Sequence, residues 1–94
     1  MKSEQAIQSE IIIYLRKIFC YPRKVVSKAG TPDILACCDG KFVGIEVKKL
    51  DGKVSKLQDH NIKLIKQAGG IAFVARSVQD VQDYFEKIKL FDRR

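Results

Sequence analysis

The chain has 94 residues, of which 18 are Lys or Arg and 11 are Asp or Glu, so its formal net charge is +7. No apolar run approaches the ~20 residues of a membrane-spanning helix, and the opening MKSEQAIQSE is too polar for a secretory signal. The basic excess favours a polyanionic partner over an anionic membrane surface, because no segment combines a basic helical face with aromatic anchors.

The cysteine content favours a reducing environment. Cys20, Cys37 and Cys38 make an odd number, and the last two are adjacent in a predicted strand. Neighbouring residues of a strand face opposite sides of the sheet, so these two thiols do not converge. A disulfide framework and a zinc site are therefore disfavoured, and the cytoplasm is the expected location.

The first half of the chain predicts one helix and two strands, within a single domain of residues 1–94. Apolar residues recur at helical spacing from about residue 3 to residue 19, and Pro22 blocks a longer helix. A short strand is predicted near residues 24–28 and a second at residues 33–38, with a proline-containing turn between them.

The second half begins with a hairpin. Asp39-Gly40 is a strong signal for a two-residue turn, and residues 41–48 form the third predicted strand. A helix capped by Ser55, a fully apolar strand at residues 71–75 and a last amphipathic helix follow. The order α-β-β-β-α-β-α predicts an α/β fold with a mixed central sheet flanked by helices, in which the fourth strand is parallel to the third.

Charged residues interrupt the third predicted strand at Glu46 and Lys48, which share one face because side chains alternate along a strand. The Asp39-Gly40 turn sets a register that places Asp33 opposite Glu46, with Cβ atoms ~4.5–5.5 Å apart. Two carboxylates that close repel each other unless a cation lies between them. A structural ion pair needs only one carboxylate, so the favoured interpretation is a site for a divalent metal such as Mg²⁺.

Five ordered segments resemble a known family. Thr31-Pro32-Asp33 followed by Glu46-Val47-Lys48 resembles the PD-(D/E)xK nuclease signature. The segments that are similar to the small phage and bacterial VRR-Nuc branch, over about residues 3–81, are SEQAIQSEIIIYLR, GTPDIL, GKFVGIEVKK, SKLQ and GGIAFVARS. The resemblance implies a PD-(D/E)xK nuclease-like domain in the cytoplasm of a bacterium or a phage host. It also implies a metal-dependent endonuclease that cuts branched DNA such as four-way (Holliday) junctions.

The resemblance implies a role for each matching position. Asp33 and Glu46 would hold Mg²⁺ or Mn²⁺, with the backbone carbonyl of Val47 as a further ligand. The cation would polarise the scissile phosphate and lower the pKa of its water. Lys48 would orient or help deprotonate the attacking water and balance charge in the transition state. Gln58 would support the site from beside Lys48.

The first predicted helix offers two candidates for a further acidic residue of the site. Glu4 and Gln8 bracket the apolar stripe of this helix, whereas Glu10 lies roughly 100° away from it. Glu4 therefore faces the sheet, and the resembled family also carries its glutamate at this position. Glu4 is the predicted site residue, with Glu10 as the alternative.

Basic residues flank the predicted site. Lys49, Lys53 and Lys56 follow the third strand, and Arg76 ends the neighbouring fourth strand. These side chains are predicted to contact the DNA backbone. The chain shows no recognition helix or zinc finger, so sequence-specific readout is not expected.

Two other functions fit the same fold. The main alternative is a non-catalytic DNA-binding module, although the intact set of Asp33, Glu46 and Lys48 argues against lost activity. A restriction-type nuclease is the other, but 94 residues leave little room for base readout. A homodimer is expected, because two symmetric cuts resolve a four-way junction. The C-terminal segment carries surplus apolar residues that pairing through this segment or through the first predicted helix would bury, namely Val78, Val81, Tyr84, Phe85, Ile88, Leu90 and Phe91.

Overall fold

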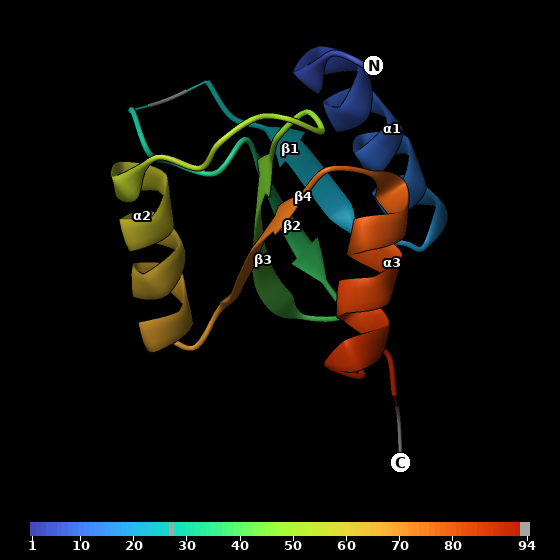
Figure 1. Cartoon of the computed structure of the whole chain (residues 1–94). Coiled ribbons are helices and arrows are strands. Elements are labelled where there is room, and N and C mark those ends of the chain that lie inside the picture. The colour runs from blue at the N-terminus through green and yellow to red at the C-terminus, as the bar shows by residue number, and fades with distance from the viewer. Residues whose placement is uncertain (27, 93–94) are drawn as a thin grey trace.

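The computed structural model describes residues 1–26 and 28–92, which form helices and a four-stranded sheet (Figure 1). The elements in chain order are α1 (Glu4–Lys17), β1 (Tyr21–Lys24), β2 (Ile34–Cys38), β3 (Lys41–Val47), α2 (Lys56–Gln67), β4 (Ile71–Ala75) and α3 (Val78–Lys87). The predicted element order and the α/β fold are confirmed. Within the described residues, none of the helices has the length and apolar character needed to span a bilayer.

The pairing of β2 with β3 follows from the turn at Asp39 and Gly40. Both residues have positive φ, 52° and 78°, which two-residue hairpin turns require and which Asp and Gly tolerate. The turn pairs the two strands antiparallel in the predicted register. Asp33, just before β2, is thereby brought to the level of Glu46 near the end of β3. β4 pairs parallel with β3, also as predicted.

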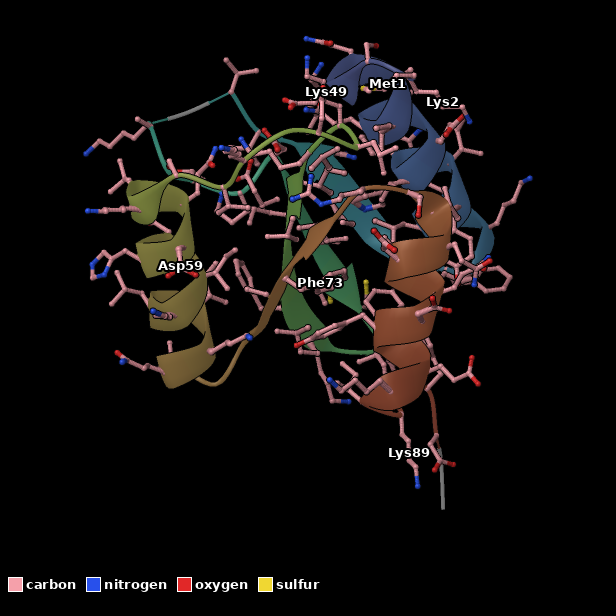
Figure 2. The ribbon with its side chains drawn as sticks, viewed as in Figure 1. Met1, Lys2, Lys49, Asp59, Phe73 and Lys89 are labelled. Carbon is pink, nitrogen blue, oxygen red and sulfur yellow. The ribbon has the colours of Figure 1, made fainter. Side chains whose placement is uncertain are left out.

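The two faces of the sheet have different neighbours. α1 and α3 cover one face, and α2 lies against the other (Figure 1). The hairpin turns its apolar residues toward α1 and α3, where each is at most 5% exposed: Ile34, Ala36, Cys38, Val43, Ile45 and Val47. Phe73 of β4 stacks on Tyr84 of α3 with ring centroids 4.1 Å apart, between the sheet and α3 (Figure 2). Because side chains alternate, Glu46 belongs to the face of α2.

β1 lies earlier in the chain than predicted. It spans Tyr21–Lys24 instead of about residues 24–28, and it includes Pro22. β1 is an edge strand that pairs only with β2. A proline is tolerated there because one row of backbone N–H groups in an edge strand has no ladder partner. Ser27, which the predicted strand included, lies outside the described residues.

Serine hydroxyl groups define the starts of α1, α2 and α3. Ser3, Ser55 and Ser77 each accept a hydrogen bond from the backbone N–H three residues ahead, at 3.2, 3.1 and 3.1 Å. Such a cap stabilises a helix by about 1 kcal/mol, because it satisfies an N–H group that has no partner within the helix. The predicted cap at Ser55 is therefore confirmed, and it sets where α2 begins beside the end of β3.

Candidate functional site

Asp33, just before β2, and Glu46, near the end of β3, lie at the same end of the hairpin. The carbonyl of Asp33 accepts a hydrogen bond from the Val25 N–H at 2.8 Å, which holds its backbone beside the end of β1. The Asp33 side chain accepts another at Oδ2 from the Val47 N–H, also at 2.8 Å. The Asp33 carboxylate is therefore fixed over the end of β3, next to Glu46.

Glu46 is a buried carboxyl group with too few partners. The residue is 2% exposed, and its Oε2 accepts a hydrogen bond from Nε2 of Gln58 at 3.1 Å. Its Oε1 is buried and has no hydrogen-bond partner among residues 1–26 and 28–92. The pKa of Glu46 is raised from 4.5 to about 8, first by burial and then by the neighbouring carboxyl group of Asp33, and Lys48 opposes this rise only in part. A positive ion at Oε1 would stabilise the ionised form.

Lys48 stands beside Glu46. Its backbone N–H donates to the carbonyl of Ala75 at 3.1 Å, so the extended pairing with β4 continues one residue past β3. Side chains alternate along such a segment, and Lys48 therefore shares the face of Glu46. Lys48 is partly buried, whereas Lys49 is exposed. The structure thus brings two carboxyl groups and one ammonium group together at this end of the hairpin.

Gln58 links the start of α2 to the site through both ends of its side-chain amide. Its Oε1 accepts a hydrogen bond from the Ser55 N–H at 2.9 Å, and the Ser55 hydroxyl accepts one from the Gln58 N–H at 3.1 Å. These two bonds form a capping box. The Nε2 group is then directed to Glu46. Gln58 therefore contacts Glu46, the neighbour of Lys48 on the same face.

Of the two acidic candidates in α1, Glu4 is the one that approaches the site. Its Oε2 accepts a long hydrogen bond of 3.4 Å from the Lys49 N–H, and its charge contributes to the raised pKa of Glu46. Glu10 instead forms an exposed ion pair with Lys2 at 2.7 Å. The orientation expected for α1 from its apolar stripe agrees with this placement.

The basic residues that were predicted to bind DNA surround the loop between β3 and α2. Lys49, Lys53 and Lys56 are exposed, and Figure 2 shows Lys49 close to the N-terminal end of α1. Arg76 is engaged within the protein. Its Nη1 donates to backbone carbonyls of the loop, those of Lys49 (2.8 Å), Leu50 (3.3 Å) and Gly52 (2.7 Å). A phosphate contact by Arg76 would therefore have to come from its other guanidinium nitrogens.

The donor atoms of the site suit a hard divalent cation. Among residues 1–26 and 28–92, no three Asp, Glu, His or Cys side chains converge into a complete metal cage. Mg²⁺ does not require one, because it binds through one or two carboxylates and keeps several waters. Asp33 and Glu46 supply two carboxyl groups, and a cation would satisfy the buried Oε1 of Glu46. The residues present therefore fit Mg²⁺ or Mn²⁺.

Gln8 is a residue beside the site that the sequence did not single out as functional. It is 8% exposed, and its Oε1 is buried without a hydrogen-bond partner in the part of the chain that the structure describes. It lines a cavity of about 330 Å³ together with Asp33 and Gln58. The sequence did contain a signal for Gln8, because an amide side chain is uncommon on the buried stripe of an amphipathic helix.

The buried carboxyl group should make the stability of the metal-free protein depend on pH. Unfolding lowers the pKa of Glu46 from about 8 to near 4.5, so it releases a proton between these values. The free energy of unfolding therefore falls as the pH rises through this range. At pH 8 in a chelator, we expect Glu46→Gln to be more stable than the wild type by about 1–3 kcal/mol. Urea unfolding measures this difference, which should shrink toward pH 5; identical pH profiles would contradict the expectation.

Comparisons with known proteins agree on one kind of fold. The family model described as archaeal Holliday junction resolvase (Hjc) matches residues 10–94. A solved structure described as a VRR_NUC domain matches with a TM-score of 0.77 and 23% identity, over 88% of this chain and 94% of that chain. A second, described as a VRR_NUC domain protein, matches with a TM-score of 0.74 and 20% identity, over 93% and 89%. No curated protein gives a significant match.

Proposed function

The chain belongs to the archaeal Holliday junction resolvase family of nucleases and has the fold of a VRR-Nuc domain, and on this premise we propose that it is a divalent-metal-dependent endonuclease. Its proposed substrate is branched DNA, and the preferred form is a four-way junction. The observation that supports this most strongly is the meeting of Asp33 and Glu46 beside Lys48, with one buried oxygen of Glu46 left without a partner.

The residues of the site would divide the work of phosphodiester hydrolysis. Asp33 and Glu46, with the backbone carbonyl of Val47, would hold Mg²⁺ or Mn²⁺, which polarises the scissile phosphate and lowers the pKa of a bound water. Lys48 would orient the attacking water and balance the negative charge that develops on the phosphate oxygens. Gln58 occupies Oε2 of Glu46, so Oε1 is the oxygen that remains for the cation.

Exposed lysines around the loop between β3 and α2 would hold the DNA backbone. Lys49, Lys53 and Lys56 offer three ammonium groups next to the site, and contacts of this kind gain affinity by releasing counterions from DNA. Arg76 supports them by holding the loop that carries Lys49. We locate the reaction in the cytoplasm, where DNA is present and the three free cysteines would stay reduced.

A cleavage assay on a panel of DNA structures tests this function directly. Labelled duplex, flap, splayed-arm and four-way junction DNA are incubated with the protein in Mg²⁺, in Mn²⁺ or in a chelator. We expect cleavage only with metal, and faster cleavage of the four-way junction than of duplex. Tight binding without cleavage of any substrate in either metal would favour the non-catalytic DNA-binding module instead.

The two acidic residues of α1 should differ in their effect on cleavage. Glu4→Gln is expected to slow metal-dependent cleavage by about 10-fold or more, because Glu4 lies beside the site and its charge acts on Glu46. Glu10→Gln is the matched control, since Glu10 only pairs with Lys2 on the surface. Single-turnover rates at several Mg²⁺ concentrations make the comparison, and a larger loss in Glu10→Gln would reverse the assignment.

A homodimer is expected in solution before DNA binds. A two-fold dimer provides two sites related by the symmetry of a four-way junction, which needs two symmetric cuts. The C-terminal segment buries Val81, Phe85 and Leu90 within its own domain, but Ile88 and Phe91 remain exposed for pairing. Light scattering on a sizing column should give twice the 10.7 kDa of one chain. A protein mass near 10.7 kDa, with and without junction DNA, would exclude the dimer and indicate an enzyme that nicks one strand.

A further inference from the structure

Two buried side-chain oxygens lack a hydrogen-bond partner among the residues that the structure describes, Oε1 of Glu46 and Oε1 of Gln8. The proposed cation accounts for the oxygen of Glu46. It does not account directly for Gln8, which is uncharged and lies in α1, outside the strands that carry the two carboxyl groups. Buried polar groups are nearly always hydrogen-bonded, so the amide oxygen of Gln8 indicates a partner that residues 1–26 and 28–92 do not supply.

The surroundings of Gln8 indicate where that partner would be. Gln8 lies one helical turn after Glu4, and it lines the cavity of about 330 Å³ that Asp33 and Gln58 also line. Gln58 in turn donates a hydrogen bond to Glu46. The cavity therefore places Gln8 near Asp33, one proposed ligand of the cation, and near Gln58, which contacts the other proposed ligand.

The packing of α1 does not require an amide at this position. The other buried residues of the helix are apolar, namely Ile7, Ile11 and Leu15. A Met or Leu side chain at position 8 would have a similar volume and would bury no unpartnered oxygen. Because the unpartnered atom is an acceptor, the missing group is a hydrogen-bond donor, and a water molecule is the smallest donor that could fill this role.

We propose that Gln8 is a positioning residue of the metal site: its Oε1 accepts a hydrogen bond from a water molecule that hydrates the cation held by Asp33 and Glu46. This inference rests on the proposed function, because it requires the cation. Protein-bound Mg²⁺ keeps several of its waters, and those waters are donors. Outer hydrogen-bond partners of this kind orient the inner ones, so Gln8 acts on cation affinity without touching DNA.

Three variants test the role of the amide oxygen. Gln8→Met keeps the length of the side chain and removes the acceptor, whereas Gln8→Glu keeps an acceptor oxygen. Gln5→Met is the control, because Gln5 lines the same cavity from an exposed position. Isothermal titration calorimetry without DNA should show Mn²⁺ binding weakened about 10-fold in Gln8→Met, and no weakening in the other two. Urea unfolding in a chelator should show Gln8→Met to be at least as stable as the wild type.

The outcomes separate this inference from the proposed function. A Gln8→Met protein that binds Mn²⁺ as tightly as the wild type would overturn the inference. Equal losses of Mn²⁺ affinity in Gln8→Met and Gln8→Glu would also overturn it, because they would indicate an effect of packing alone. If Gln8→Met does not fold, Gln8→Asn withdraws the oxygen and should weaken binding as well. If Glu46→Gln loses Mn²⁺ binding while Gln8→Met keeps it, only the role of Gln8 fails. If Glu46→Gln binds Mn²⁺ normally, the proposed metal site itself fails.

Discussion

A Glu46→Gln protein should bind junction DNA and yet cleave it at least ~10²-fold more slowly than the wild type in Mg²⁺. Glutamine has the shape of glutamate, but it lacks the negative charge that would hold the cation. Its side-chain amide can still accept the hydrogen bond from Gln58. Since burial and Asp33 already favour the neutral form of Glu46, the neutral glutamine should retain the folded state. A loss of cleavage would then come from the site and not from unfolding.

Single-turnover cleavage of a labelled four-way junction, with protein in excess, isolates the chemical step from product release. DNA binding is measured separately in a chelator. Asp59→Asn is the matched control because it makes the same change of charge on α2 (Figure 2). Asp59 is exposed and pairs with Lys63 at 3.0 Å. Cleavage by Glu46→Gln at the rate of the wild type would remove the metal site from the proposed function.

The second large effect is expected from two adjacent lysines. Lys48 is partly buried beside Glu46, and its charge acts on that carboxyl group. Lys49 is exposed, with its ammonium group 4.0 Å from Asp51. We therefore expect Lys48→Met to reduce turnover to the background rate with a modest loss of DNA affinity. Lys49→Met should mainly weaken binding.

The salt dependence of binding distinguishes these two effects. Each lysine that contacts a phosphate contributes about one unit to the slope of log affinity against log salt concentration. The slope should decrease in Lys49→Met and stay unchanged in Lys48→Met. The rate at saturating protein should fall only in Lys48→Met. If the two variants behaved alike in both assays, the position of Lys48 on the face of Glu46 would not determine its role in cleavage.

The parts of the fold that were predictable from the sequence depend on local signals. The Asp39-Gly40 turn determines the register of β2 with β3 within a few residues of chain, and the period of two then assigns Glu46 to one face. Ser55 defines the start of α2 in the same local way. The approach of Glu4 to the site could be inferred from helical angles, because a single helix has only one apolar side.

The features that escaped prediction depend on contacts between distant segments. β1 was placed too late because its position depends on pairing with β2, which local sequence patterns do not reveal. Arg76 was expected at DNA, but carbonyl groups more than twenty positions earlier in the chain engage its Nη1. The burial of Gln8 without a partner becomes visible only when α1 is docked on the sheet. The roles of these residues in catalysis remain predictions.

The capping box of α2 restricts which residue can occupy position 58. Glutamate completes a capping box as well as glutamine does, so the helix alone would accept either. At this position, however, a glutamate would direct a further negative charge at Glu46, whose pKa is already raised. Only the longer amide meets both demands, since one end must accept from Ser55 and the other must donate to the carboxyl group. A variant of this chain with Gln58→Glu would therefore keep the start of α2, but its Glu46 would be harder to ionise.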